Sequence, residues 1–94
     1  MKKIEIEVYA QNANMAVVRM PDRHFPGIVI QGDSLSILCK LATSILSRAI
    51  IAGDAELVDG ARELTDLLTS RLQFYESILQ EHGIGLPYSP AKLD

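Results

Sequence analysis

The sequence predicts a small α+β domain, in which a three-stranded, mainly antiparallel sheet is packed on an antiparallel helix pair in the order β-β-β-α-α. Two observations indicate this class. Apolar residues recur at every second position in the first third of the chain and at every third or fourth position after it. Clusters of glycine, proline and asparagine separate the segments. The 94 residues allow one modest core. We expect one domain over residues 1–85 and an extended tail over 86–94.

The first two strands are expected to form a hairpin. Apolar and acidic residues alternate over residues 3–10, which is typical of a half-buried strand. Residues 11–14 predict a turn, because asparagine tolerates left-handed backbone angles. Residues 15–20 predict the returning strand.

A short apolar third strand is expected over residues 28–30. The loop before it ends in Pro26 and Gly27, a pair that suits the middle of a type II turn with the glycine at positive φ. This loop separates the hairpin from the third strand.

The first helix is expected over residues 33–52. It carries only two charged side chains after its first turn, Lys40 and Arg48, and its apolar positions cover more than half of the helical circumference. That arc is wider than the usual amphipathic stripe. We therefore expect this helix to be covered on two sides, by the sheet and the other helix, or to belong to a subunit interface. The apolar fraction of 48% is high for a small domain and favours a homodimer.

The second helix is expected to run from Asp54 to about His82. Gly53 can end the first helix as a left-handed cap, Asp54 can cap the second one, and Gly83 can stop it. Because the connection is short, the two helices should be antiparallel neighbours.

Large residues are expected to face small ones between the helices, which allows close packing. Gly60 costs about 1 kcal/mol relative to alanine inside a helix, and a close helix approach would explain it. The expected pairs are Ala49 with Leu57, Leu46 with Ala61, and Ala42 with Leu64.

The stretch Gly32-Asp33-Ser34-Leu35 resembles the name-giving motif of a large family of lipases and esterases, in which the serine is the nucleophile. That resemblance also implies a base from a C-terminal Asp-x-x-His, and this sequence has none. Its only histidines are His24 and His82. Because a serine without a base is a poor nucleophile, we expect Asp33 or Ser34 to cap the first helix. A hydrolase at Ser34 stays a remote alternative, and no catalytic residue is assigned.

A first candidate binding site is the loop before the third strand. Arg19, Arg23 and His24 are cations that can recognise a carboxylate or phosphate. Gln31 and Asp33 follow where a strand leads into a helix N-terminus, a place that favours anions, although Asp33 would compete with a phosphate. These residues define one alternative function, a small-molecule or anion sensor. The other interpretation is a solvated loop with balanced charges.

A second candidate site is the surface of the second helix. Carboxylates such as Asp59, Glu63 and Asp66 could face a basic partner. Arg71 falls on the apolar arc of the same helix, so it either extends past its neighbours to water or pairs with a carboxylate of another subunit or partner. Cys39 lies on the apolar arc of the first helix and should be a buried, inert thiol.

Composition excludes several classes of function. The net charge of −3, from nine basic and twelve acidic residues, argues against nucleic-acid binding. A single cysteine provides neither a disulfide framework nor a multi-cysteine metal site, and we expect no metal and no cofactor. The absence of a disulfide fits a reducing compartment. No apolar run approaches the roughly 18 residues of a membrane span, and nothing resembles a signal peptide. The expectation is a cytoplasmic protein without a membrane partner.

The segment from Ala16 to Leu35 resembles the core of a family of small uncharacterised bacterial proteins. The resemblance rests on an arginine–x–Phe–Pro–Gly pattern, here Arg23 to Gly27, followed by aliphatic residues and Gln-Gly-Asp-Ser-Leu. It implies a bacterial, cytosolic domain of unknown function and assigns no catalytic residue. It marks Arg19, Arg23, Gln31 and Asp33 as positions to test.

The function expected from the sequence is that of a non-catalytic binding protein. Small acidic domains without catalytic constellations often occlude a partner protein, as immunity proteins and antitoxins do. The sensor and the remote hydrolase stay as alternatives.

Overall fold

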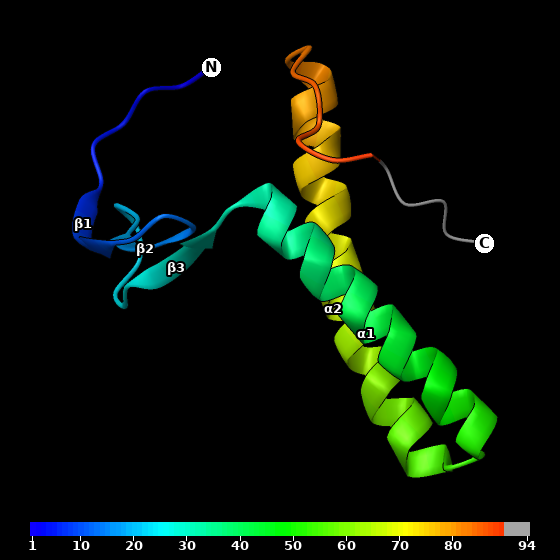
Figure 1. Cartoon of the computed structure of the whole chain (residues 1–94). Helices are drawn as coiled ribbons and strands as arrows, with labels where there is room; N and C mark the ends of the chain where they lie inside the picture. The colour runs from blue at the N-terminus through cyan, green and yellow to red at the C-terminus, as the bar shows by residue number, and fades with distance from the viewer. Residues whose placement is uncertain (90–94) are drawn as a thin grey trace. The chain divides into compact units, whose positions relative to one another are not determined.

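The computed structural model describes residues 1–89, and its elements confirm an α+β protein with the order β-β-β-α-α (Figure 1). The chain divides into two compact units, Met1–Gln31 and the part that begins at Gly32. A single domain over residues 1–85 and the packing of the sheet on the helices stay predictions. The elements are β1 (Glu7–Gln11), β2 (Met15–Arg19), β3 (Gly27–Ile30), α1 (Gly32–Ala52) and α2 (Ala55–Glu81).

The first unit is an antiparallel sheet in the order β1-β2-β3. β1 begins at Glu7, so the prediction that the strand starts at residue 3 is wrong. Glu7 pairs with Arg19, the last residue of β2, and Pro21 has no N–H with which to extend the ladder. β1 also contains a bulge between Val8 and Ala10.

Two predicted uses of left-handed backbone are wrong. In the β1–β2 turn, the Asn12 side chain accepts hydrogen bonds from the N–H groups of Asn14 and Met15, at 3.1 and 3.0 Å. No non-glycine residue in the described chain has positive φ, so this side-chain bonding forms the turn. Gly27 also lacks positive φ and opens β3 opposite Val18, which excludes the type II turn.

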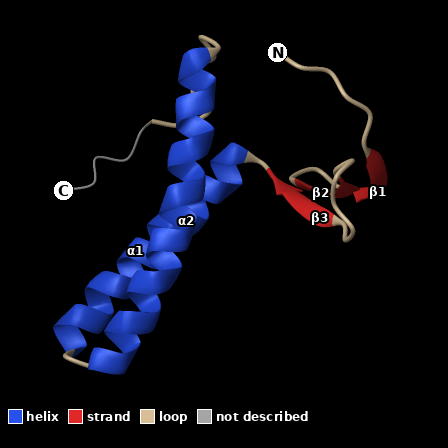
Figure 2. Ribbon diagram, turned by 180° about the vertical axis from the view of Figure 1, so that it is seen from behind, coloured by secondary structure: helices blue, strands red, loops and turns tan. Residues whose placement is uncertain are grey.

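The second unit is a hairpin of two long helices that run side by side in opposite directions (Figures 1 and 2). Gly53 has φ of 71° and donates its N–H to Ala49 at 3.1 Å, which confirms the predicted cap. Asp54 accepts from the N–H of Leu57 at 3.1 Å, which confirms the N-cap of α2. Gly83, with φ of 66°, follows the helix end as predicted.

The start of α1 differs from the prediction. The helix begins at Gly32, so Asp33 and Ser34 lie inside its first turn and neither is the cap. Asp33 accepts a hydrogen bond from the N–H of Ser34 at 2.9 Å. A Cβ on Gly32 would lie 2.1 Å from Cζ of Tyr75. The tyrosine ring of α2 therefore occupies the space that a side chain at the helix start would take.

The fully buried positions of the hairpin are small residues, and two of the three predicted pairs of large and small side chains are wrong. Leu57 and Leu64, expected to face alanines, are 50% and 47% exposed. A Cβ on Gly60 would meet no atom within 4 Å in the described chain, so the predicted close approach at that glycine is also wrong. The buried positions are Gly32, Ser36, Cys39, Ala42, Ala49, Ala61 and Thr65.

The chain after α2 folds back over part of that helix. The N–H of Ile84 donates to the carbonyl of Leu79 at 2.9 Å, and the hydroxyl of Tyr88 donates to Glu76 at 2.9 Å. Of the predicted tail over 86–94, residues 90–94 lie outside the described part.

Candidate functional site

Arg19 is engaged by a neighbour within the sheet. Its guanidinium forms an ion pair with Glu7, the residue opposite it in the β1–β2 ladder. Tyr9 donates its hydroxyl to the same carboxylate at 2.9 Å. The Arg19 hydrogen bond, with that of Tyr9, lowers the pKa of Glu7, and the carboxylate in turn raises the pKa of Arg19. The predicted anion-binding arginine therefore already holds a carboxylate.

Arg23 and His24 lie on the exposed loop before β3. The N–H of Arg23 donates to the carbonyl of Met20 at 3.0 Å, which closes a turn, and the ring of His24 packs edge-on to Phe25 with centroids 4.7 Å apart. Arg19 lines an open depression of about 400 Å³ between Glu5 and Pro21 that neither of these residues lines. The three cations thus do not share one pocket.

The other two residues of the predicted sensor site lie elsewhere. Gln31 donates its backbone N–H to Asn14 at 3.2 Å and lines a depression of about 110 Å³ beside the β1–β2 turn. Asp33 belongs to the helical unit. Within the sheet unit, no single pocket collects the cationic residues and Gln31.

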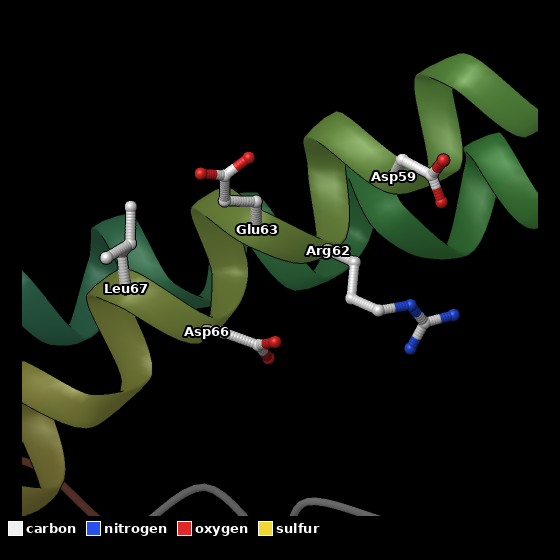
Figure 3. A pocket seen from close by; sticks show the side chains of 5 residues that line it. All are labelled: Asp59, Arg62, Glu63, Asp66 and Leu67. Atoms are coloured by element: carbon white, nitrogen blue, oxygen red, sulfur yellow. The ribbon is translucent and has the colours of Figure 1, made fainter.

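Three acidic residues of α2 lie close together on its surface. Asp59, Glu63 and Asp66 are exposed and follow one another at spacings of four and three residues, which places them on one side of the helix. With Arg62 and Leu67 they line an open depression of about 400 Å³ (Figure 3). We call these three carboxylates the acidic row. The sequence predicted these surface carboxylates. It did not predict the exposed apolar side chain of Leu67 beside them.

Arg71 is exposed and bonded to its own helix. Its Nη1 donates to the carbonyl of Leu67 at 2.9 Å. No carboxylate of the described residues forms an ion pair with it. The long side chain lies along the surface of α2, and its pairing with a carboxylate of another subunit or partner stays a prediction.

A small polar hollow between the helices was not anticipated. It measures about 90 Å³ and includes Cys39, Lys40 and Thr43 of α1, with Gln73 and Glu76 of α2. Cys39 is buried as expected; burial raises the pKa of its thiol, and the charge of Glu76 adds to that effect. A thiol with a raised pKa is a weak nucleophile at neutral pH. The signal in the sequence was the row of hydroxyl residues on an otherwise apolar helix.

The structure also places Ser34 and the side chains that could bind a metal ion. Ser34 is half-buried, and no hydrogen bond links its hydroxyl to a histidine in this part of the chain. Nor do three histidine, cysteine, aspartate or glutamate side chains of residues 1–89 lie close enough together to hold a metal ion.

α1 is more apolar as a whole than its short runs of apolar residues suggested. By length and composition alone it could cross a membrane, with a mean hydropathy of 1.6 over its most apolar window. The core helix of a soluble protein meets the same criterion. Its partner α2 carries six acidic residues against two arginines and does not share this property.

Comparison with known proteins identifies a family without a known role. A family model described as "Family of unknown function (DUF6959)" matches residues 1–88. No curated protein and no solved structure shows significant similarity to the chain.

Proposed function

The chain belongs to this family of unknown function, DUF6959, and from its own residues we propose that it is a non-catalytic protein that acts by binding another protein. The observation that carries the proposal is the acidic row on the exposed surface of α2. A row of like charges attracts a partner surface of opposite charge. The depression is also too open to enclose a small molecule, whose sites are usually concave and largely buried.

The partner that this surface suits is a basic protein. α2 carries six acidic and two basic residues, a formal charge of −4, whereas the whole chain carries −3. The negative charge is therefore concentrated on this helix. Such a surface accelerates encounter with a positive patch and suppresses binding of acidic proteins. The role we propose is that of an immunity or antitoxin-type inhibitor, which occludes the basic surface of its target.

The sensor alternative has weaker support. Its central residue, Arg19, already pairs with Glu7, and Arg23 and His24 line no pocket with it. The hydrolase alternative lacks a base for Ser34. We therefore place the function on α2. The proposal also includes a bacterial, cytoplasmic setting and the Arg-x-Phe-Pro-Gly and Gln-Gly-Asp-Ser-Leu pattern as the family's core.

The experiment is to identify what the protein retains from extracts of its native cells. The variant Asp59→Lys/Glu63→Lys/Asp66→Lys reverses the acidic row. Its matched control reverses three exposed carboxylates elsewhere, Glu5→Lys/Asp22→Lys/Glu81→Lys, with the same change in net charge. Both variants are checked for folding by circular dichroism.

The wild type and the control should retain the same basic protein, identified by mass spectrometry, and the row variant should lose it. The affinity of the purified pair should fall as salt rises from 50 to 500 mM, because exposed charge pairs are screened. A row variant that retains the same partner with unchanged affinity would refute the proposal.

A further inference from the structure

α2 carries two apolar seams side by side, and only one of them faces α1. The inner seam comprises Val58, Ala61, Thr65, Leu68, Leu72 and Tyr75, all buried or half-buried. The outer seam lies one residue earlier at every step and is exposed. Both follow the alternating three- and four-residue spacing by which helices pack against helices. The outer seam comprises Leu57, Gly60, Leu64, Leu67, Arg71 and Phe74.

α1 repeats this arrangement. Its inner seam of Leu35, Cys39, Ala42, Leu46 and Ala49 is buried or half-buried. Leu38, Leu41, Ile45, Arg48 and Ala52 follow the same three- and four-residue spacing and are all exposed. Leu41 is 56% and Ile45 is 50% exposed. Each helix therefore has a second seam that the other helix does not cover.

The two outer seams lie on the same face of the hairpin. Lys40 of α1 and Gln73 of α2 line one small hollow, which marks the opposite, polar face. At about 100° per residue, each outer seam lies across the inner seam from these hollow-lining residues. The hairpin thus has one polar face and one apolar face made by both helices.

We propose that this apolar face binds the same face of a second copy, and that the two hairpins form an antiparallel four-helix bundle. The three- and four-residue spacing favours a helix as the occupant, because the side chains of one such seam fit the gaps in the seam of another helix. The described chain has two helices, and both already use their inner seams on each other. A second copy supplies an identical pair of seams and closes the assembly by two-fold symmetry.

The outer seam of one copy fits the same seam of the second copy when a two-fold axis relates the two copies. With α2 antiparallel to its copy, Leu64 of one copy faces Leu67 of the other, and Leu57 faces Phe74. Arg71 then faces Gly60, whose missing side chain leaves room for the arginine stem while the guanidinium reaches the edge. A single polar residue in such a seam helps to select one register.

The outer seam of α1 also complements itself about a central position. This position lies at nearly the same height along the bundle as the centre of the α2 seam. Leu41 of one copy faces Ile45 of the other when the axis passes near Thr43. That centre lies about 10 residues before Gly53, and the α2 centre lies about 12.5 residues after it, so the two centres differ by about 4 Å along the bundle. One axis therefore serves both helices.

The large apolar side chains of the two outer seams are 39–69% exposed. A standard interface needs about 800 Å² from each partner, and seven large apolar side chains at this exposure supply much of it. Glu63 and Asp66 lie outside both seams, so the acidic row stays on the outer surface of the bundle.

The first test measures mass by sedimentation velocity on the full chain. The wild type is expected to be a dimer at tens of micromolar. Leu64→Glu puts a carboxylate into the outer seam and should raise the dissociation constant at least about 100-fold. Gln73→Glu adds the same charge on the polar face and should leave the dimer intact. Circular dichroism should show that both variants keep their helices. The acidic-row variant should also stay dimeric, so this inference and the proposed function can fail separately.

The second test leaves both outer seams unchanged and reports the register. Nitroxide labels are placed at Ser77→Cys in a Cys39→Ser background and measured by double electron–electron resonance. The antiparallel register places the two labels about 35 Å apart along the bundle. A parallel arrangement would place them within about 20 Å. The inference is overturned by a wild type that stays monomeric at 500 µM, by a Leu64→Glu dimer as tight as the wild type, or by the short label distance.

Discussion

Gly32→Ala tests the contact between the start of α1 and α2. The added Cβ would lie 2.1 Å from Cζ, 2.3 Å from Cε1 and 2.4 Å from the hydroxyl oxygen of Tyr75. Carbon atoms in contact lie about 3.5–4.0 Å apart, so the ring must move by about 1.5 Å. Overpacking of this kind costs about 1–3 kcal/mol, and alanine regains up to about 1 kcal/mol through helix propensity. We expect a net loss of about 1–2 kcal/mol in the free energy of unfolding.

The assay is urea unfolding followed by circular dichroism, at one fixed protein concentration because self-association adds to stability. A loss of 1 kcal/mol should lower Tm by about 4–8 °C in a chain of this size. Gly85→Ala is the matched control. A Cβ there would meet no atom within 4 Å and φ is not positive, so it should stabilise by about 0.4–1 kcal/mol.

A double-mutant cycle isolates the contact. Tyr75→Leu removes the end of the ring, so Gly32→Ala should cost less in that background, with a coupling energy of about 0.5–3 kcal/mol. If Gly32→Ala is as stable as the wild type and the coupling is zero, the ring does not need the space above Gly32 and the reasoning is refuted.

Glu7→Gln removes the acceptor of Arg19 and Tyr9. Folding lowers the pKa of Glu7 below its ordinary value of 4.5. The ionised carboxylate therefore stabilises the folded protein above pH 4.5, and this stabilisation disappears as the pH falls below that value. The Tm difference between wild type and variant should therefore shrink in acid; a constant difference would contradict this. Tyr88→Phe should cost about 0.5–1.5 kcal/mol in urea unfolding at pH 7. Burial and the hydrogen bond to Glu76 raise the pKa of the Tyr88 hydroxyl above its ordinary value of 10.0. The stability that this bond contributes is therefore present below pH 10.0 and is lost as the pH rises further. Equal stability of the wild type and Tyr88→Phe at pH 7 would exclude this contribution. Ser34→Ala should change stability by less than about 0.5 kcal/mol, whereas Asp54→Ala should cost about 0.5–2 kcal/mol; the reverse order would restore Ser34 as a cap. Phosphate should produce no thermal shift that depends on Arg23, and a shift lost in Arg23→Ala would favour the sensor.

Features set by neighbouring residues were predictable from the sequence. Gly53 and Asp54 define their caps through backbone angle and side-chain chemistry within a few positions. The order of strands and helices follows from the period of the apolar residues. The acidic row was predictable as well, because its members lie one helical turn apart.

Features set by distant residues were not predictable in this way. The space above Gly32 is filled by Tyr75, which lies on the other helix. The sequence pattern therefore could not show that the glycine, and not Ser34, decides how α1 begins. The wide apolar arc of α2 contained two seams, and choosing Leu57 and Leu64 as the inner residues selected the wrong one.

The sole cysteine makes the opening of the hairpin measurable. Cys39 lines a small hollow between the helices and is only 7% exposed, so a thiol reagent should reach it mainly when α1 and α2 separate locally or the protein unfolds. The rate of modification at neutral pH then reports how often the hairpin opens. This natural probe needs no engineered label, and a bound partner that clamps the helices should slow its reaction.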